Sequence, residues 1–263
     1  MRDVEDPRGV LRPSRLPSFH RIPAPDGLAD RIRWFWIPRW SLPPGETSRQ
    51  ELLPFPASNL VVEADGVALS GPSTRIAHRD LSGEGWAVGA LLRPAGVVAL
   101  GARPEELRDR EVAFAAPDLH AAVADAMADP DEESARERAV AAYASWAAEH
   151  LPPAGAFGAL ANAMEELIAD DRSITRVDAV ADRLGLSVRG VQRLAREHVG
   201  LPPLAIIRRY RLQEAAQRLR EDASATVAEV AADLGYADHA HLAADFRTTL
   251  GFTPSAYRAA DNH

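Results

Sequence analysis

The pattern of apolar and polar positions in residues 176–258 contains one short motif twice. Residues 180–185 read VADRLG, and residues 230–235 read VAADLG. In each copy the apolar side chains predict one face of a short helix, and the glycine ends that helix because it accepts a positive φ. A residue able to cap a second helix follows each copy, Ser187 and Asp238. The pattern therefore predicts two helix-turn-helix units, with second helices at about 187–198 and 238–250.

The segment between the two units, residues 202–220, keeps apolar side chains at helical spacing. Pro202 and Pro203 fit a first turn, where a missing N–H costs nothing. A helix of this length spans roughly 27 Å, close to the ~34 Å of one DNA turn. The two second helices are therefore predicted to reach successive major-groove faces from one monomer.

Residues 117–150 are rich in Ala, with larger apolar side chains at helical spacing. Residues 129–131 (DPD) break this stretch into two helices, residues 151–155 (LPPAG) form a linker, and a further helix is expected at about 157–170. The apolar stripe of the Ala-rich helices is wider than a lone surface helix needs. We expect a homodimer that buries Val140, Tyr143 or Trp146.

The first part of the chain alternates short strand-like segments with Gly and Pro turns. Strands are predicted at 31–40, 59–63, 67–70, 73–79 and 86–92, with a hairpin at residues 64–66 (ADG). This spacing predicts a small sandwich or barrel. Residues 1–25 are rich in Pro and Arg with little periodicity, which predicts a partly ordered arm.

Composition narrows the classes of protein that fit. A chain of 263 residues with 46% hydrophobic and 26% charged residues is typical of a two-domain soluble protein. No run approaches 18 apolar residues and the first residues are charged, so we expect no membrane span, no signal sequence and a cytoplasmic location. The absence of Cys excludes disulfides and thiolate chemistry.

The net charge of −8 is unfavourable for DNA binding, so its distribution matters. Residues 173–211 hold eight Arg and three acidic residues, a net +5, whereas residues 212–263 hold four Arg and eight acidic residues, a net −4. The basic surface is therefore predicted on the first unit and the start of the central helix.

The first unit has the side chains needed to read DNA. Arg189, Gln192, Arg193 and Arg196 are spaced i, i+3, i+4 and i+7, so they share one helix face. Arg recognises guanine and Gln recognises adenine in the major groove. We assign the first three to bases and Arg196 to phosphate, because the N-terminal half of such a helix reaches base edges. Ser187, at the start of this helix, is a further candidate DNA contact. The alternative is an ordinary solvated helix face.

The second unit is poorer in polar side chains. Ala240, Ala243 and Ala244 point outward without donors, which leaves His239 and Arg247 as its candidate DNA contacts. Asp245 would repel phosphate unless it is paired within the domain. We expect this unit to position the protein more than to read sequence.

Several separated motifs carry a family resemblance. The segments LGLSVRGVQRL (184–194), IRRYRL (207–212), GYAD (235–238) and GFTPSAYR (251–258) resemble the C-terminal DNA-binding domain of AraC-type transcription regulators. The resemblance implies seven helices with two helix-turn-helix units, and base reading at positions 189, 192 and 193. It also implies that the place of Ala244 often holds Arg. The segments WSLPPG (40–45), LPFP (53–56), GPST (71–74) and LRP (92–94) resemble cupin-like N-terminal domains of such regulators.

Together these observations predict an α+β protein in four parts. They are an arm (1–25), a β-rich cupin-like regulatory domain (26–116), a helical linker or dimerisation region (117–153) and an AraC-type double helix-turn-helix domain (154–263). The expected function is sequence-specific transcription regulation. The partners are double-stranded DNA, a small-molecule effector, RNA polymerase and a second copy. The alternatives are a cupin-like enzyme or ligand carrier with a DNA-binding tail, and a docking module without a ligand.

The remaining candidates concern small molecules. An effector site is predicted at Trp34, Trp36, Trp86 and Arg93. Core packing is nevertheless the better explanation for at least two of the Trp side chains, and Arg93 could equally bridge strands. His20, His78 and His120 are scattered, and the sequence has no phosphate-binding loop and no nucleophile elbow. The sequence therefore predicts no metal, no cofactor and no enzyme.

Overall fold

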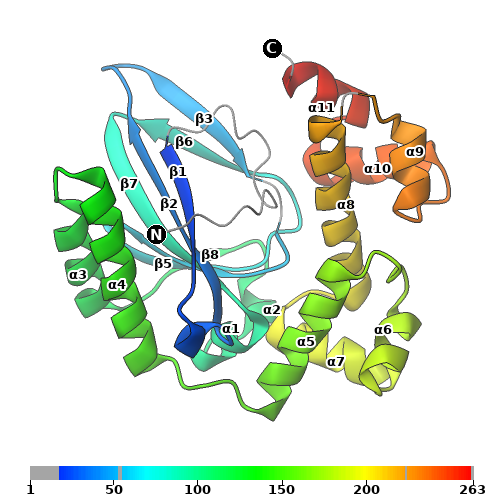
Figure 1. The fold of residues 1–263 in the computed structure, drawn as a ribbon, viewed down its shortest axis with the longest axis horizontal. Coiled ribbons are helices and arrows are strands. Elements are labelled where there is room, and N and C mark those ends of the chain that lie inside the picture. Colours follow the sequence, from blue (N-terminus) through cyan, green and yellow to red (C-terminus); the bar gives the residue numbers. More distant parts are fainter. Residues whose placement is uncertain (1–17, 53–54, 223, 262–263) are drawn as a thin grey trace.

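The computed structural model describes residues 18–52, 55–222 and 224–261 (Figure 1). An N-terminal β-rich part is followed by an all-helical C-terminal part, which confirms the predicted α+β class. The strands are β1 (Ser18–Pro23), β2 (Ile32–Ser41), β3 (Thr47–Leu52), β4 (Asn59–Glu63), β5 (Gly66–Ser70), β6 (Ala77–Ser82), β7 (Glu84–Leu92) and β8 (Glu111–Ala113).

Six of these strands form one antiparallel sheet in the order β1-β2-β7-β4-β5-β8, and β3 pairs with β6 in a separate two-stranded ribbon. The predicted hairpin is confirmed, since Glu63 pairs with Gly66 across the turn between β4 and β5. One predicted strand is displaced, because residues 73–76 form a loop and β6 begins at Ala77. The helices α1 (Pro94–Ala99) and α2 (Pro104–Leu107) lead out of the sheet towards the C-terminal helices (Figure 1).

The first strand corrects the predicted arm. Ser18–Pro23 pairs with residues 34–39 of β2 along its whole length, so this segment is an edge strand of the sheet. An edge strand tolerates Pro and needs only one apolar face. Its sequence pattern is therefore weak, and the neighbouring Pro residues indicated an irregular segment instead. Residues 1–17 of the predicted arm lie outside the described residues.

The helices α3 (Pro117–Met127) and α4 (Glu132–His150) cover one face of the sheet (Figure 1). Their apolar stripes join Phe35, Leu60 and Val88 in one core. Tyr143 is fully buried there, and its hydroxyl donates a 2.7 Å hydrogen bond to the Leu60 carbonyl. Val140 and Tyr143 are therefore unavailable for the predicted dimer interface, because the sheet of the same chain already covers them.

Seven helices of the described residues make up the C-terminal part, as the family resemblance implied. They are α5 (Ala156–Asp170), α6 (Val177–Leu184), α7 (Val188–His198), α8 (Pro203–Glu221), α9 (Val227–Asp233), α10 (His239–Leu250) and α11 (Pro254–Asp261). The central helix α8 links two cores. Ile206 and Tyr210 belong to the core around α6 and α7, and Leu212 and Leu219 to the core around α9 and α10.

The fold gives a prediction about Tyr143. The substitution Tyr143→Phe removes the buried hydrogen bond to Leu60 and leaves the ring in place, so it should lower the free energy of unfolding by about 1 kcal/mol. Urea unfolding followed by circular dichroism measures the change. Ser145→Ala, at an exposed position of the same helix, is the control and should be nearly neutral. An unchanged midpoint for Tyr143→Phe would show that the hydroxyl does not stabilise the packing of α4 on the sheet.

Candidate nucleic-acid interface

The first helix-turn-helix unit is built as the repeat predicts. Gly185 ends α6 with φ 64°, and the Leu186 amide donates back to the Ala181 carbonyl at 2.9 Å. Ser187 then caps α7 by accepting a 3.1 Å hydrogen bond from the Gly190 amide. The left-handed glycine reverses the chain, and the cap starts the next helix at once. The Ser187 side chain is therefore the helix cap that the sequence predicts, and its contact with DNA stays a prediction.

The helix α7 has one buried and one exposed face. Val191, Leu194 and Ala195 are buried against α5, α6 and α8. The predicted reading residues Arg189, Gln192 and Arg193 are exposed, as is Arg196. The structure thus brings all four onto one solvent-facing surface, which we call the α7 reading face. Val188, beside this face, is 40% exposed.

One residue of the reading face touches the β-rich domain. The Arg196 Nε atom lies 3.6 Å from an oxygen of Glu105 in α2. Both side chains are partly open to solvent, so the ion pair is weak and screened by salt. This contact could not be predicted from the sequence, because the two residues are 91 positions apart.

The second unit has the same plan with a different surface. Thr226 and Glu229 form a reciprocal capping box at the start of α9, and Gly235 turns the chain with φ 67°. Asp238 caps α10 by accepting a 2.8 Å hydrogen bond from the His241 amide. The exposed positions of α10 are His239, Ala240, His241, Ala244, Arg247 and Thr248. Its surface therefore offers few donors.

Asp245 does not stand free on the second unit. It is half-buried and interacts electrostatically with the guanidinium groups of Arg209 and Arg211 and with Tyr236. The Arg211 guanidinium stacks 4.1 Å over the Tyr236 ring. Burial, and then the charge of Asp245, raise the pKa of Tyr236. The Arg side chains of α8 thus lie near enough to offset the charge of Asp245.

The β-rich domain packs directly on the first unit. Trp34, Phe55 and Leu91 enter the same core as α5, α6 and α7. Arg108 donates two hydrogen bonds, of 3.0 and 2.7 Å, to the Gly200 carbonyl just beyond α7. A Cβ atom at Gly200 would lie 2.4 Å from the Pro104 carbonyl oxygen, so glycine permits this close approach.

The four candidate effector residues are not brought together. Trp34 is buried against Phe55 at the contact with the helices, with ring centroids 6.2 Å apart. Trp36 lies on the same sheet face and donates a 2.9 Å hydrogen bond to Asn59. Trp86 packs against the core on the opposite face, and Arg93 pairs with Glu166 of α5 at 2.5 Å. The sequence places the three Trp residues on predicted strands. It does not show which face of the sheet the helices cover.

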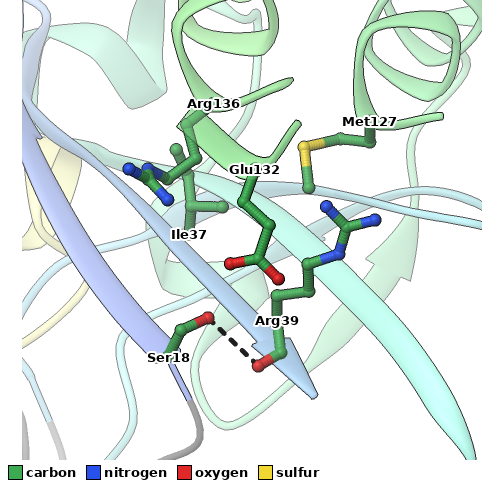
Figure 2. A pocket seen from close by; sticks show the side chains of 6 residues that line it. All are labelled: Ser18, Ile37, Arg39, Met127, Glu132 and Arg136. Carbon is green, nitrogen blue, oxygen red and sulfur yellow. Dashed lines mark hydrogen bonds between the residues drawn. The ribbon is translucent and has the colours of Figure 1, made fainter. Parts of the chain in front are cut away.

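A small cavity lies elsewhere in the β-rich domain. It is lined by residues of β1, β2 and the facing ends of α3 and α4, among them Arg39, Glu132 and Arg136 (Figure 2). Its volume of ≈ 10 Å³ has room for about one water molecule. None of the four candidate effector residues lines it.

Two further findings concern the described part of the chain. No three His, Asp or Glu side chains come together there in a way that would hold a metal ion. No helix there is both long and apolar enough to cross a membrane.

Two helix-turn-helix units joined by one long helix, each presenting an exposed second helix, define a double helix-turn-helix domain of the DNA-binding kind. Residues 180–260 match a helix-turn-helix domain family, and residues 20–113 match a domain family of unknown function, DUF6597. Residues 180–260 thus form a helix-turn-helix domain similar to that of AraC-type regulators, as the motifs indicated.

The similar curated proteins are HTH-type transcriptional activators named RhaS. That of Escherichia fergusonii is 36% identical over 81 residues, which cover 31% of this chain and 29% of the relative. That of Escherichia coli O157:H7 is 33% identical over 95 residues, or 36% of this chain and 33% of the relative. The match thus spans about a third of the length of these relatives.

Solved structures of similar proteins include ToxT from Vibrio cholerae. One crystal form is 12% identical, covers 86% of this chain and 98% of that chain, and has a TM-score of 0.48. The DNA-binding domain of AdpA, solved in complex with a target DNA, is 36% identical and covers 37% of this chain and 84% of that chain, with a TM-score of 0.31.

The cap of α10 gives a prediction. Asp238→Ala leaves the amide of His241 without its acceptor, and the free energy of unfolding should fall by about 1 kcal/mol. Asp238→Asn keeps a good capping side chain and should stay close to the wild type. Urea unfolding of the three proteins measures the difference. Equal losses in both variants would mean that the charge of Asp238, rather than the cap, stabilises the helix.

Proposed function

We propose that this protein is a sequence-specific DNA-binding transcription regulator in which the first helix-turn-helix unit reads the base sequence. The α7 reading face supports this proposal, because three exposed side chains suited to bases lie on the N-terminal and central turns of a capped helix. The relatives are transcriptional activators, and the matched segment is the domain that holds this face.

We further propose that the second unit contributes mainly positioning contacts. Its exposed surface holds a single Arg, Arg247, and the start of α10 has one amide already used by the cap. The other exposed side chains of α10 are His239, Ala240, His241, Ala244 and Thr248. Phosphate contacts of this kind fix the register of a protein on the duplex without reading sequence. We place the protein in the cytoplasm because its DNA target lies there.

The other expected partners stay predictions, namely a second copy of the chain and RNA polymerase. The division of the chain at residues 26, 117 and 154 also stays a prediction. So does a small-molecule effector in the β-rich domain, where Trp34 and Trp36 share a sheet face.

The proposal is tested by selecting bound fragments from random duplex DNA with the full chain. A recurrent sequence motif is the expected result. The slope of log affinity against log salt should be negative, because Arg side chains displace counterions from phosphates. Binding without a recurrent motif would contradict sequence-specific regulation.

Individual Arg side chains give the next prediction. Arg189→Ala or Arg193→Ala should weaken binding to the selected duplex by about 1–3 kcal/mol and relax the preference at the contacted base pair. Titration by fluorescence anisotropy measures both effects. Arg138→Ala, at an exposed position of α4, is the control. A larger loss for Arg247→Ala than for Arg189→Ala would assign sequence reading to the second unit instead.

The donor-poor surface of α10 gives a further prediction. Ala244 is exposed, so Ala244→Arg should add a phosphate contact and steepen the salt dependence by about 0.9. Ala244→Gln adds length without charge and should leave the slope unchanged. Binding at a series of salt concentrations measures the slopes. If the Arg and Gln variants bind alike while both stay folded, α10 does not approach the DNA backbone.

A further inference from the structure

The loop between β5 and β6 of the β-rich domain contacts the second helix-turn-helix unit at a small, largely polar junction. The loop between β5 and β6 reaches the end of α10, where the Ile76 amide donates a 3.0 Å hydrogen bond to the Thr249 carbonyl. Thr249 is buried in the last turn of that helix. This backbone hydrogen bond fixes the position of the loop along α10.

Arg209 of the central helix completes the junction. Its Nη1 atom donates to the Thr249 hydroxyl at 2.6 Å, and its Nη2 atom donates to the Thr74 carbonyl of the β5–β6 loop. The planar guanidinium directs donors at fixed angles, so it holds its partners in one geometry. One side chain thus joins α8, α10 and the β-rich domain.

The loop itself is held from inside the β-rich domain by Asp109. One carboxylate oxygen accepts from the Thr74 amide and the other from the Thr74 hydroxyl, both at 2.6 Å. Asp109 has φ 55° and is the one non-glycine residue with positive φ in the described part of the chain. Such a conformation persists where surrounding contacts determine it, and it occurs often at functional sites.

The two units differ in how they are fixed to the β-rich domain. The first shares a hydrophobic core with Trp34, Phe55 and Leu91. The core of the second unit contains no fully buried residue of the β-rich domain among the described residues, and only Ile76 packs partly against it. The orientation of the second unit therefore depends on the central helix and on the junction at Arg209.

We propose that Arg209 is a positioning residue that sets the orientation of α10 relative to α7, and that Asp109 places the β5–β6 loop against it. The β-rich domain thereby determines where the second unit meets DNA. This last step rests on the proposed DNA-binding function, whereas the orientation itself does not.

The orientation is measured as a distance between the two units. The chain has no Cys, so Asp182→Cys on α6 and Ala232→Cys on α9 add the only two thiols, both at exposed positions. Nitroxide labels on these thiols report the distance distribution by pulsed electron resonance in the full chain. The wild type should give one narrow distance, because the junction holds one geometry.

Two variants disrupt the junction, one in the β-rich domain and one on the central helix. Asp109→Ala frees the loop and Arg209→Gln shortens the bridging side chain, so each should widen the distribution or add a second distance. Asp109→Asn keeps an oxygen for the Thr74 amide and should restore the narrow distance. Arg49→Gln, on an exposed pair of the β3–β6 ribbon, makes the same chemical change as Arg209→Gln away from the junction and should leave the distance unchanged.

A footprint on the selected duplex tests whether the orientation of α10 affects DNA binding, separately from the orientation itself. With Asp109→Ala, protection by the second unit should be lost while protection by the first unit stays. An unchanged distance distribution in Asp109→Ala overturns the positioning role even if Arg209→Gln does not fold, because Asp109 is exposed and belongs to none of the hydrophobic cores. A changed distance with an unchanged footprint overturns the link to DNA. A wild type that binds no DNA overturns the proposed function and leaves the distance result to decide the positioning role.

Discussion

A buried charge at the boundary between sheet and helices sets the arrangement of the molecule. Glu165 of α5 is only 3% exposed, and it accepts hydrogen bonds from Arg33 of β2 at 3.1 Å and from the Tyr210 hydroxyl of α8. A buried carboxylate that loses its partner costs several kcal/mol, typically about 3–5. Each of the three elements is therefore held by the other two. The aromatic rings of Trp34, Phe55 and Tyr210 pack around the same point, with neighbouring centroids 6.2 and 5.8 Å apart.

This boundary explains why the linker after α4 is not a free hinge. Asp30 accepts a 2.7 Å hydrogen bond from the Ala154 amide, and the side chain of Asn162 joins the Asp30 carbonyl to the Ala95 amide. Arg31 donates to the carbonyl of Leu151. Residues that looked like a Pro- and Gly-rich spacer are thus fastened to the β-rich domain at several points. The sequence showed a boundary between domains but not the contacts that cross it.

Local signals in the sequence predicted local structure well. The repeated Gly, the caps Ser187 and Asp238 and the hairpin at residues 64–66 all act within a few residues, and the structure has each of them. The strand β3 was missed because its residues TSRQEL show no clear alternation of apolar and polar side chains. A short ribbon strand with two largely polar faces lacks that signal.

Long-range packing could not be read from the sequence in the same way. An apolar stripe on α4 indicates that this face of the helix is buried. The sequence alone does not distinguish burial against a second copy from burial against the sheet of the same chain. Tyr143 settles this locally, since its ring packs 5.2 Å from Phe35 in the core of the sheet. Likewise, the acidic Asp245 looked unfavourable beside DNA because its Arg neighbours on α8 are 34 and 36 positions away.

The exposed reading face limits how the β-rich domain can influence DNA binding. Arg189, Gln192 and Arg193 remain exposed while α2 packs against the other end of α7, so the docked domain does not cover the side chains that we propose to read bases. Arg196 alone is drawn towards an acidic neighbour, across 3.6 Å. Covering the reading face is therefore not how this arrangement controls binding. What the β-rich domain does hold is the relative placement of the two units, through a shared core for the first and a few hydrogen bonds for the second. Because the second set of contacts is small and directional, a modest change in the β-rich domain alters the orientation of α10 before it disturbs α7.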